Sequence, residues 1–142
     1  MAKKKLKSIA KVSQQAAELL QLLARLKTAD ENGYCSCVTC GVTRHYKDRM
    51  QGGHFISRVR TATRLLEENI HPQCAYCNGP LKSNPVAYTL FMIDTYDREF
   101  VDELEILKHQ TKKWSRFDLE CEISVLRERI KEQEARVVGV AA

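Results

Sequence analysis

Two closely spaced cysteine pairs are the residues of this sequence with the clearest capacity for chemistry. Cys37 and Cys40 form the first pair, and Cys74 and Cys77 form the second, with two residues inside each pair. This spacing lets both thiolates of a pair turn toward one ion, and two pairs supply the four ligands of a tetrahedral zinc site. Four thiolates leave no open coordination position, so we expect a structural zinc ion, with Gly41 allowing the tight turn after the first pair.

The two remaining cysteines receive other interpretations. Cys35 is separated from Cys37 by one residue, which is a less usual chelate spacing, so it is left out of the zinc shell. Cys121 falls in an expected helix, where we expect a small buried apolar side chain. We expect a cytoplasmic protein, because no apolar run approaches the roughly 18 residues of a membrane helix and no signal peptide is apparent. The reducing cytoplasm favours metal binding over disulfides.

Three residues between and just after the cysteine pairs carry a resemblance to a known nuclease superfamily. They are His54, Asn69 and Asn78. A β-hairpin followed by a helix and pinned by zinc resembles the treble-clef form of the HNH, or ββα-metal, nucleases. The resemblance implies that His54 is the general base, that Asn69 orients the hairpin and the base, and that Asn78 binds a catalytic divalent cation, with His54 as a further candidate ligand.

The implied mechanism is chemically reasonable for these residue types. An imidazole titrates near neutral pH and can take a proton from water. The resulting nucleophile attacks phosphorus, while Mg²⁺ or Mn²⁺ neutralises charge on the phosphate and the leaving oxygen. An amide such as that of Asn69 can fix the orientation of the loop and the imidazole.

Longer motifs narrow the resemblance. Cys-x-x-Cys-Gly, then residues 53–58 (GHFISR), then residues 69–78 (NIHPQCAYCN) look like the lambdoid-phage NinG recombination endonuclease family. The similarity covers roughly residues 37–110, with a weaker echo in the C-terminal helix. It implies cleavage of branched recombination intermediates such as Holliday junctions and displacement loops, by a phage- or prophage-encoded protein in a bacterial host.

The sequence departs from many ββα-metal sites at one position. Gly53 stands immediately before the histidine, where many of these sites have an aspartate as a second metal ligand; NinG-like proteins also tend to have glycine there. The sequence therefore identifies too few ligands to complete the coordination shell of the catalytic metal. The alternatives for a further oxygen ligand are Asp48, Glu67, Glu68 and Asn84.

A basic surface is expected around this site. The residues expected to contact DNA are Arg58, Arg60, Arg64, His71 and Lys82. Arginine suits bidentate phosphate contacts, and the net charge of +5 permits nucleic-acid binding without establishing it. The alternatives are a solvated arginine loop and a His71 that only supports the hairpin. No segment resembles a base-reading helix, so we expect recognition of DNA shape and backbone.

The periodicity of apolar residues predicts an α+β, mostly helical fold that positions these groups. The expected elements are a helix from Ser8 to about Asp30 ended by Asn32-Gly33, strands in Arg49–Ser57 and Asn69–Gln73, a helix from near Asn78 with Pro80 and Pro85 in first turns, Arg98–His109 capped by Asp97, and a helix capped by Ser115 to about Val137. We expect one compact domain with three parts: a basic arm and amphipathic helix at 1–33, a zinc-bound core at 34–95, and C-terminal helices at 96–142.

Two apolar stripes need partners. One is the leucine-rich stripe of the first helix, and the other is the seam of Leu119, Ile123, Leu126 and Ile130. They can pack on each other or on a second copy of the chain. Resolving a junction takes two symmetric cuts, so a homodimer is expected. No recombination partner is identified by the sequence.

Three alternative functions are kept. The first is a non-catalytic zinc module that binds DNA, and the second is a generic HNH nicking nuclease that acts on linear duplex. The third is a zinc-dependent scaffold for protein contacts, which predicts no salt-sensitive affinity for DNA.

Overall fold

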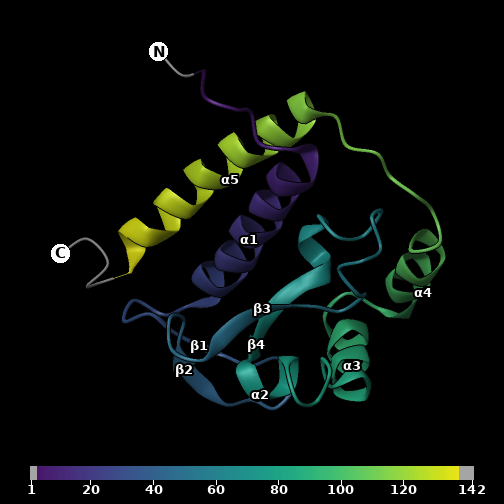
Figure 1. Cartoon of the computed structure of the whole chain (residues 1–142). Coiled ribbons are helices and arrows are strands. Elements are labelled where there is room, and N and C mark those ends of the chain that lie inside the picture. Colours follow the sequence, from purple (N-terminus) through teal and green to yellow (C-terminus); the bar gives the residue numbers. More distant parts are fainter. Residues whose placement is uncertain (1–2, 138–142) are drawn as a thin grey trace.

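The computed structural model describes residues 3–137, and within this range the chain forms five α-helices and two small antiparallel sheets (Figure 1). The helices are α1 (Ile9–Thr28), α2 (Ala75–Asn78), α3 (Pro85–Thr95), α4 (Arg98–Leu107) and α5 (Arg116–Arg136). The strands are β1 (Tyr34–Ser36), β2 (Thr43–His45), β3 (Met50–His54) and β4 (Ile70–Cys74). The predicted α+β class is confirmed.

Each sheet is a two-stranded hairpin. β1 pairs with β2, with Tyr34 opposite His45. β3 pairs with β4, with Met50 opposite Cys74 and His54 opposite Ile70. The two longer strands fall close to the predicted segments 49–57 and 69–73. The β1–β2 hairpin lies in a segment for which the sequence indicated only turns, because three-residue strands carry no measurable alternation.

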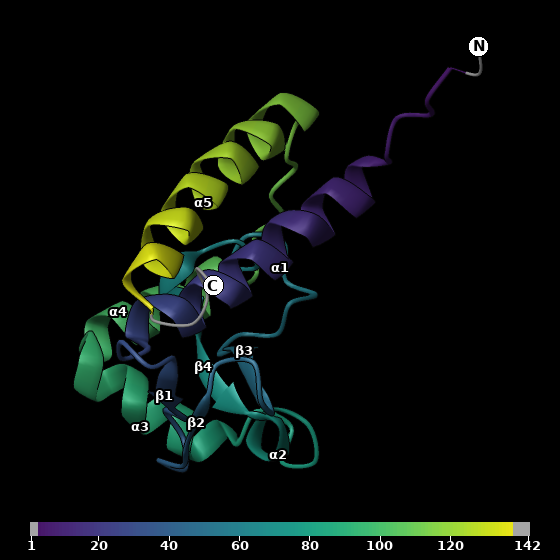
Figure 2. The same ribbon diagram turned by 90° about the vertical axis from the view of Figure 1, so that its left-hand side faces the viewer.

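The leucine-rich stripe of α1 packs against the seam of α5 within the same chain. Leu20 and Leu23 of α1 share a buried cluster with Leu126 of α5, and Val12 shares another with Leu119. Both views show the two helices side by side (Figures 1 and 2). Within the chain each stripe is covered by the other, which leaves neither stripe free to contact a second copy.

The predicted helix starts agree with the structure where a capping side chain marks them. Ser8 Oγ accepts a hydrogen bond from the Lys11 amide, Asp97 Oδ1 accepts one from Phe100, and Ser115 Oγ accepts one from Asp118. These bonds satisfy backbone N–H groups that the first helical turn leaves without partners. Pro85 is the first residue of α3, as its fixed φ favours.

Two predicted boundaries need correction. α1 ends at Thr28, before the Asn32-Gly33 turn. The predicted helix near Asn78 begins earlier, because Cys74 Sγ accepts a hydrogen bond from the Cys77 amide and starts a single helical turn inside the cysteine pair. Asn78 thus ends α2, and Pro80 lies in the turn that leads to α3.

The three predicted parts of the chain share one core. Leu23 from the first part, Met50 and Ile70 from the second, and Leu126 from the third belong to the same buried cluster. Glu67 strengthens this union, because its carboxylate lies 2.9 Å from Lys27 Nζ on α1 and 2.7 Å from Arg129 on α5. No helix in residues 3–137 is long and apolar enough to cross a membrane.

Candidate functional site

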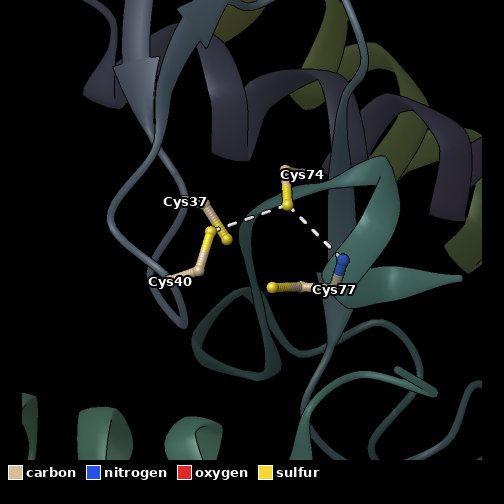
Figure 3. Close-up of side chains that lie close together, drawn as sticks. All are labelled: Cys37, Cys40, Cys74 and Cys77. Atoms are coloured by element: carbon tan, nitrogen blue, oxygen red, sulfur yellow. Dashed lines mark hydrogen bonds between the residues drawn. The ribbon is translucent and has the colours of Figure 1, made fainter. Parts of the chain in front are cut away.

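The four cysteines predicted to bind zinc come together in the structure. The Sγ atoms of Cys37, Cys40, Cys74 and Cys77 all lie within 4.8 Å of one another, and none of these cysteines is in a disulfide (Figure 3). The Sγ atoms of Cys40 and Cys74 are 3.7 Å apart. A tetrahedral ion with Zn–S bonds of about 2.3 Å would separate its sulfurs by about 3.8 Å. The four sulfurs are therefore close enough together to hold a zinc ion.

Two separate turns deliver these ligands. The first pair lies in the turn between β1 and β2, where Gly41 has a φ of 81°, as predicted, and where the Cys37 amide donates to the Val42 carbonyl at 2.8 Å. The second pair spans the end of β4 and the first turn of α2. A hydrogen bond of 3.0 Å from the Val38 amide to the Pro72 carbonyl fixes one turn against the other.

The thiol chemistry also fits a bound cation. Burial alone would raise the pKa of Cys37, but hydrogen bonds from the Thr39 side chain and from backbone amides lower this pKa to about 6. Burial and the neighbouring thiols raise the pKa of Cys40 to about 12. One thiolate thus forms readily, and a cation is needed before all four can carry charge.

The remaining two cysteines differ from each other in burial. Cys35 is buried in the core and lies outside the cluster, as predicted. Cys121 is exposed, so the prediction that it is buried is wrong. Leu119 and Ile123 direct their face of α5 toward α1, and a residue midway between them points the other way on a helix.

A cleft of about 450 Å³ beside β3 gathers four of the predicted site residues. Its lining includes His54, Arg58, Asn78 and Lys82. The rest of the lining is Gln21, Gly52, Phe55, Ser57, Ser83 and Pro85. Two cationic side chains and no acidic one line the cleft in the described part of the chain, which makes it suitable for an anionic ligand.

The His54 imidazole is buried but opens on this cleft. Its Nε2 atom lies 3.0 Å from the Arg64 carbonyl oxygen. A carbonyl can only accept a hydrogen bond, so Nε2 carries the hydrogen and the neutral ring keeps its lone pair on Nδ1. Burial lowers the pKa of His54, and the positive charges of Arg64 and Arg58 lower it further, against the opposing effect of the Arg64 carbonyl. The ring is therefore neutral at pH 7.

Asn69 holds the loop that supports His54. Its side chain is fully buried, and Oδ1 accepts from the Ile56 amide at 2.8 Å. Nδ2 donates to the carbonyls of Ile56 and Thr63 at 3.0 and 3.1 Å. Thr63 directly precedes Arg64, whose carbonyl binds the imidazole. Asn69 therefore acts on His54 through the loop, without a direct hydrogen bond between the two side chains.

The Asn78 side chain lines the cleft, where a hydrogen bond that the sequence did not predict fixes its amide group. Its Nδ2 atom donates to Gln51 Oε1 at 2.8 Å. This bond fixes the side-chain amide and leaves its oxygen, Oδ1, as the group suited to a hard divalent cation. Since Asn78 ends α2, the expected position at a helix start is corrected to the end of one helical turn.

The structure supplies a steric reason for glycine at position 53. A Cβ atom on Gly53 would lie 1.9 Å from Gln73 Oε1. The Gln73 side chain is fully buried and is held by hydrogen bonds from Nε2 to Thr39 Oγ1 at 3.1 Å and to the Ser83 carbonyl at 2.9 Å. An aspartate therefore does not fit at residue 53. The sequence analysis did not predict this role of Gln73. The only sequence feature that could have indicated it is a polar residue inside an otherwise buried strand.

His71 does not lie where a DNA contact needs it, and this expectation is corrected. The ring is buried, with Nδ1 3.0 Å from the Tyr88 hydroxyl and Nε2 2.8 Å from the Tyr96 hydroxyl. The Tyr88 hydroxyl in turn donates to the Gly53 carbonyl at 2.7 Å. Burial lowers the pKa of His71 to about 4. The alternative, a histidine that supports the hairpin, fits this geometry.

The predicted arginines divide into two groups. Arg58 is exposed at the cleft, and Arg60 is exposed outside it. Arg64 turns toward α1 instead, where Nη1 donates to Ser13 Oγ at 3.3 Å and Nη2 donates to Gln14 Oε1 at 2.6 Å. Arg64 therefore ties the loop to α1.

The residues considered as further oxygen ligands of the catalytic metal do not line the cleft. They are Asp48, Glu67, Glu68 and Asn84. Hydrogen bonds from Arg129 and Lys27 outweigh burial and lower the pKa of Glu67 to about 2, so this carboxylate serves the core. Asn84 Nδ2 lies 3.8 Å from Cys77 Sγ, at the zinc cluster. Among residues 3–137 the four-cysteine cluster is the only group of three or more histidine, cysteine or acidic side chains close enough to hold a metal.

Comparison with known proteins shows the family of the chain. No curated protein and no solved structure is similar enough to match it. A family model described as bacteriophage lambda NinG protein matches residues 1–136, nearly the whole sequence. The chain therefore belongs to the bacteriophage lambda NinG protein family.

Proposed function

We propose that this protein is a divalent-metal-dependent endonuclease of the HNH, or ββα-metal, type. The observation that carries the proposal is the state of His54: a neutral imidazole, fixed by a backbone carbonyl, that opens on a cationic cleft beside Asn78. The order of the elements supports it, since a hairpin followed by a helical turn is pinned at the four-cysteine cluster. The zinc ion in this proposal is structural.

The residues of the cleft can divide the work of phosphodiester hydrolysis. His54 Nδ1 takes a proton from a water molecule that attacks phosphorus in line. Arg58 and Lys82, which both line the cleft, hold the phosphate. Asn78 Oδ1 is the proposed protein ligand for Mg²⁺ or Mn²⁺. His54, the further candidate from the sequence, has only Nδ1 free, and that atom is used as the base. When bound, the ion neutralises charge on the phosphate and on the leaving oxygen.

The small number of protein ligands is compatible with magnesium. This ion dehydrates reluctantly and usually keeps several waters, so one or two protein oxygens are sufficient. Gly53 removes the aspartate that many related sites use, and the tight contact with Gln73 explains its absence. The proposed site therefore relies on Asn78 and on the phosphate itself to retain the ion.

The proposed substrate is branched DNA, such as Holliday junctions and displacement loops. Membership of a phage lambda family and the resemblance to recombination endonucleases support this choice. The cleft offers cationic side chains and no base-reading helix, which suits recognition of backbone and shape. We expect the protein to act in the cytoplasm of a bacterial host.

We further propose that the protein works as a homodimer, because two strands must be cut symmetrically. The two apolar stripes that the sequence suggested for this contact are covered within the chain. A dimer must therefore use another surface. A monomeric mass by light scattering, with and without junction DNA, would contradict this part of the proposal.

The deciding experiment is cleavage of a synthetic four-way junction in the presence of Mg²⁺ or Mn²⁺. His54→Ala should lower the cleavage rate by about 10²-fold or more, which is the usual contribution of a general base. His109→Ala is the matched control, because His109 is exposed and does not line the cleft. Zinc content, circular dichroism and junction affinity should be unchanged in both variants. Cleavage by His54→Ala at the wild-type rate would contradict the assignment of His54 as the general base.

A non-catalytic zinc module that binds DNA is the second candidate. The observation in its favour is that no second cluster of metal-binding side chains exists among residues 3–137. It predicts junction binding without cleavage under any divalent cation. Comparison of junction with linear duplex separates the proposed activity from a generic nicking nuclease, and salt-insensitive or absent DNA affinity would indicate a protein scaffold instead.

A further inference from the structure

A second pocket, distinct from the His54 cleft, lies beside the first turns of α1. Its volume is about 430 Å³, and its other walls come from Thr61, Arg64, Leu65 and residues 112–114. Three cationic side chains, Arg64, Lys112 and Lys113, line it together with Trp114, and no acidic side chain does so in the described part of the chain. We name this site the Trp114 pocket.

Two unsatisfied donors belong to the lining of this pocket. Among residues 3–137, three buried side-chain nitrogen or oxygen atoms lack a hydrogen-bond partner, and two of them are Arg64 Nε and Trp114 Nε1. Both are N–H groups, and both side chains line the same pocket. A buried donor without an acceptor costs about 1–3 kcal/mol, so such groups in a native fold call for a functional explanation. Neither atom is exposed to solvent, so an acceptor seated in the pocket reaches them only when the Arg64 and Trp114 side chains shift.

The surrounding chemistry specifies the kind of acceptor. Ser13 and Gln14 occupy the Nη atoms of Arg64 and leave its Nε for another partner. Lys112 Nζ lies 3.9 Å from the centre of the Trp114 ring, and the Lys112 amide donates to Thr61 Oγ1 at 2.9 Å, so the segment that carries Lys112 is fixed in place. Nitrogen donors with excess positive charge match a phosphate group.

The pocket also suits the sugar and the base that accompany each phosphate of a nucleic acid. Ile9, Ala10 and Leu65 add an apolar wall to the cationic one. A free inorganic ion needs only the charged part, whereas a nucleotide presents a sugar and a base beside its phosphate. We propose that the Trp114 pocket binds a backbone phosphate of a nucleic-acid strand, at a distance from the bond that is cut.

The pocket and the cleft are placed so that one continuous nucleic-acid strand can reach both. Ala10 lines the pocket and Gln21 lines the cleft. Eleven residues are about three turns of α-helix, so these two side chains lie on the same face of α1, about 16 Å apart. Arg64 connects the sites as well, since its side chain lines the pocket and its carbonyl binds His54. The inference rests on the proposed function only in taking DNA as the ligand of the cleft.

Trp114 makes this inference directly testable, because it is the only tryptophan in the chain. Its fluorescence is measured in the full-length, zinc-loaded protein during titration with inorganic phosphate, with a single-stranded oligonucleotide and with a four-way junction, all without Mg²⁺. The expected result is a saturable change with both DNA ligands, which phosphate reverses by competition. His54→Ala should give the same change, since the pocket does not depend on cleavage.

The discriminating variant is Lys112→Ala/Lys113→Ala. It should lower the affinity for DNA at least tenfold. It should also reduce the slope of log affinity against log salt concentration by about 1–2. The matched control is Lys47→Ala/Lys131→Ala, which removes the same charge outside the pocket; like Lys112, Lys47 lies over an aromatic ring, that of Tyr46. Anisotropy of a labelled junction provides a second measure of affinity that does not depend on Trp114.

The outcomes separate this inference from the proposed function. Absence of a fluorescence change with DNA, or equal responses in the two double variants, overturns the inference even if the junction is cut. A response to inorganic phosphate alone overturns the assignment to a nucleic-acid strand. A response to DNA that the lysine variant loses supports the inference, and it does so even if no cleavage is found and the nuclease proposal fails.

Discussion

Two histidines of one hairpin receive different chemistry from their surroundings. Gly53 pairs with His71, and His54 pairs with Ile70, so the two imidazoles lie on opposite faces of the β3–β4 ribbon. Tyrosine hydroxyls occupy both ring nitrogens of His71. A backbone carbonyl occupies one nitrogen of His54, and the ring lines the cleft. Of the two, His54 alone combines a fixed tautomer with access to a substrate.

The pH dependence of cleavage follows from this environment. The base works only when neutral, and burial lowers the pKa of His54 below the ordinary 6.5. The single-turnover rate should therefore rise with pH through a midpoint below 6.5 and then level off, when measured between about pH 5 and about pH 8. Arg58→Gln should move this midpoint upward, because the charge of Arg58 helps to lower the pKa. A midpoint above the ordinary value in the wild type would contradict the assignment.

The contact between Gly53 and Gln73 predicts a matched pair of variants. Gly53→Asp alone should destabilise the fold by several kcal/mol, since its Cβ would overlap Gln73 Oε1. The double variant Gly53→Asp/Gln73→Gly removes the clash and should regain part of that loss, as measured by urea denaturation. Equal stability of the single and double variants would show that this contact does not determine the residue at position 53.

At the scale of elements, the cysteine cluster joins two hairpins that have little core of their own. The turn between β1 and β2 provides one pair of ligands, and the end of β4 with α2 provides the other (Figure 3). Thr39 extends this junction, because its hydroxyl lies 3.3 Å from Cys37 Sγ and accepts a hydrogen bond from Gln73. The cluster is thereby linked to Ser83, whose carbonyl also binds Gln73 and which lines the cleft. Removal of the metal should disturb both hairpins.

Cys74→Ser tests this role of the cluster, because metal affinity and folding are linked. The variant should hold less than one zinc per chain by elemental analysis and should lose part of its thermal stability by circular dichroism. The matched control is Cys35→Ser, which also changes a buried cysteine but leaves the cluster intact. A Cys74→Ser protein with one zinc and an unchanged melting temperature would contradict a structural zinc site.

The elements that the sequence predicted well are those with a local signal. Ser8, Asp97 and Ser115 mark helix starts by their own hydrogen bonds, and the two-residue spacing inside each cysteine pair is sufficient to identify the four members of the cluster. The role of Arg64 was missed, and that of His71 was left open between two alternatives, because a basic side chain held by the fold has the same sequence signature as one that faces solvent. Their partners lie on helices far along the chain, at Tyr88 and on α1.

At the scale of the molecule, α1 and α5 form a pair that carries the hairpins on one side (Figure 2). Arg25 connects this pair to the first strand of the site, because its Nη1 atom donates to the Met50 carbonyl at 3.1 Å. The periodicity of the leucines showed that each helix has an apolar face, but periodicity cannot identify which surface covers that face. The sequence therefore predicted one compact domain but could not show which helix surfaces complete its core.

Leu126→Ala distinguishes a core residue from an interface residue in this helix pair. Leu126 is 2% exposed, so truncation should lower the free energy of unfolding by about 2–5 kcal/mol in urea. The adjacent Val125 is 57% exposed, and Val125→Ala should change that free energy little. Because the α5 seam is covered by α1 of the same chain, neither variant should change the mass of the folded protein by light scattering. A dimer that Leu126→Ala converts to a folded monomer would show that α5 exchanges its partner between copies.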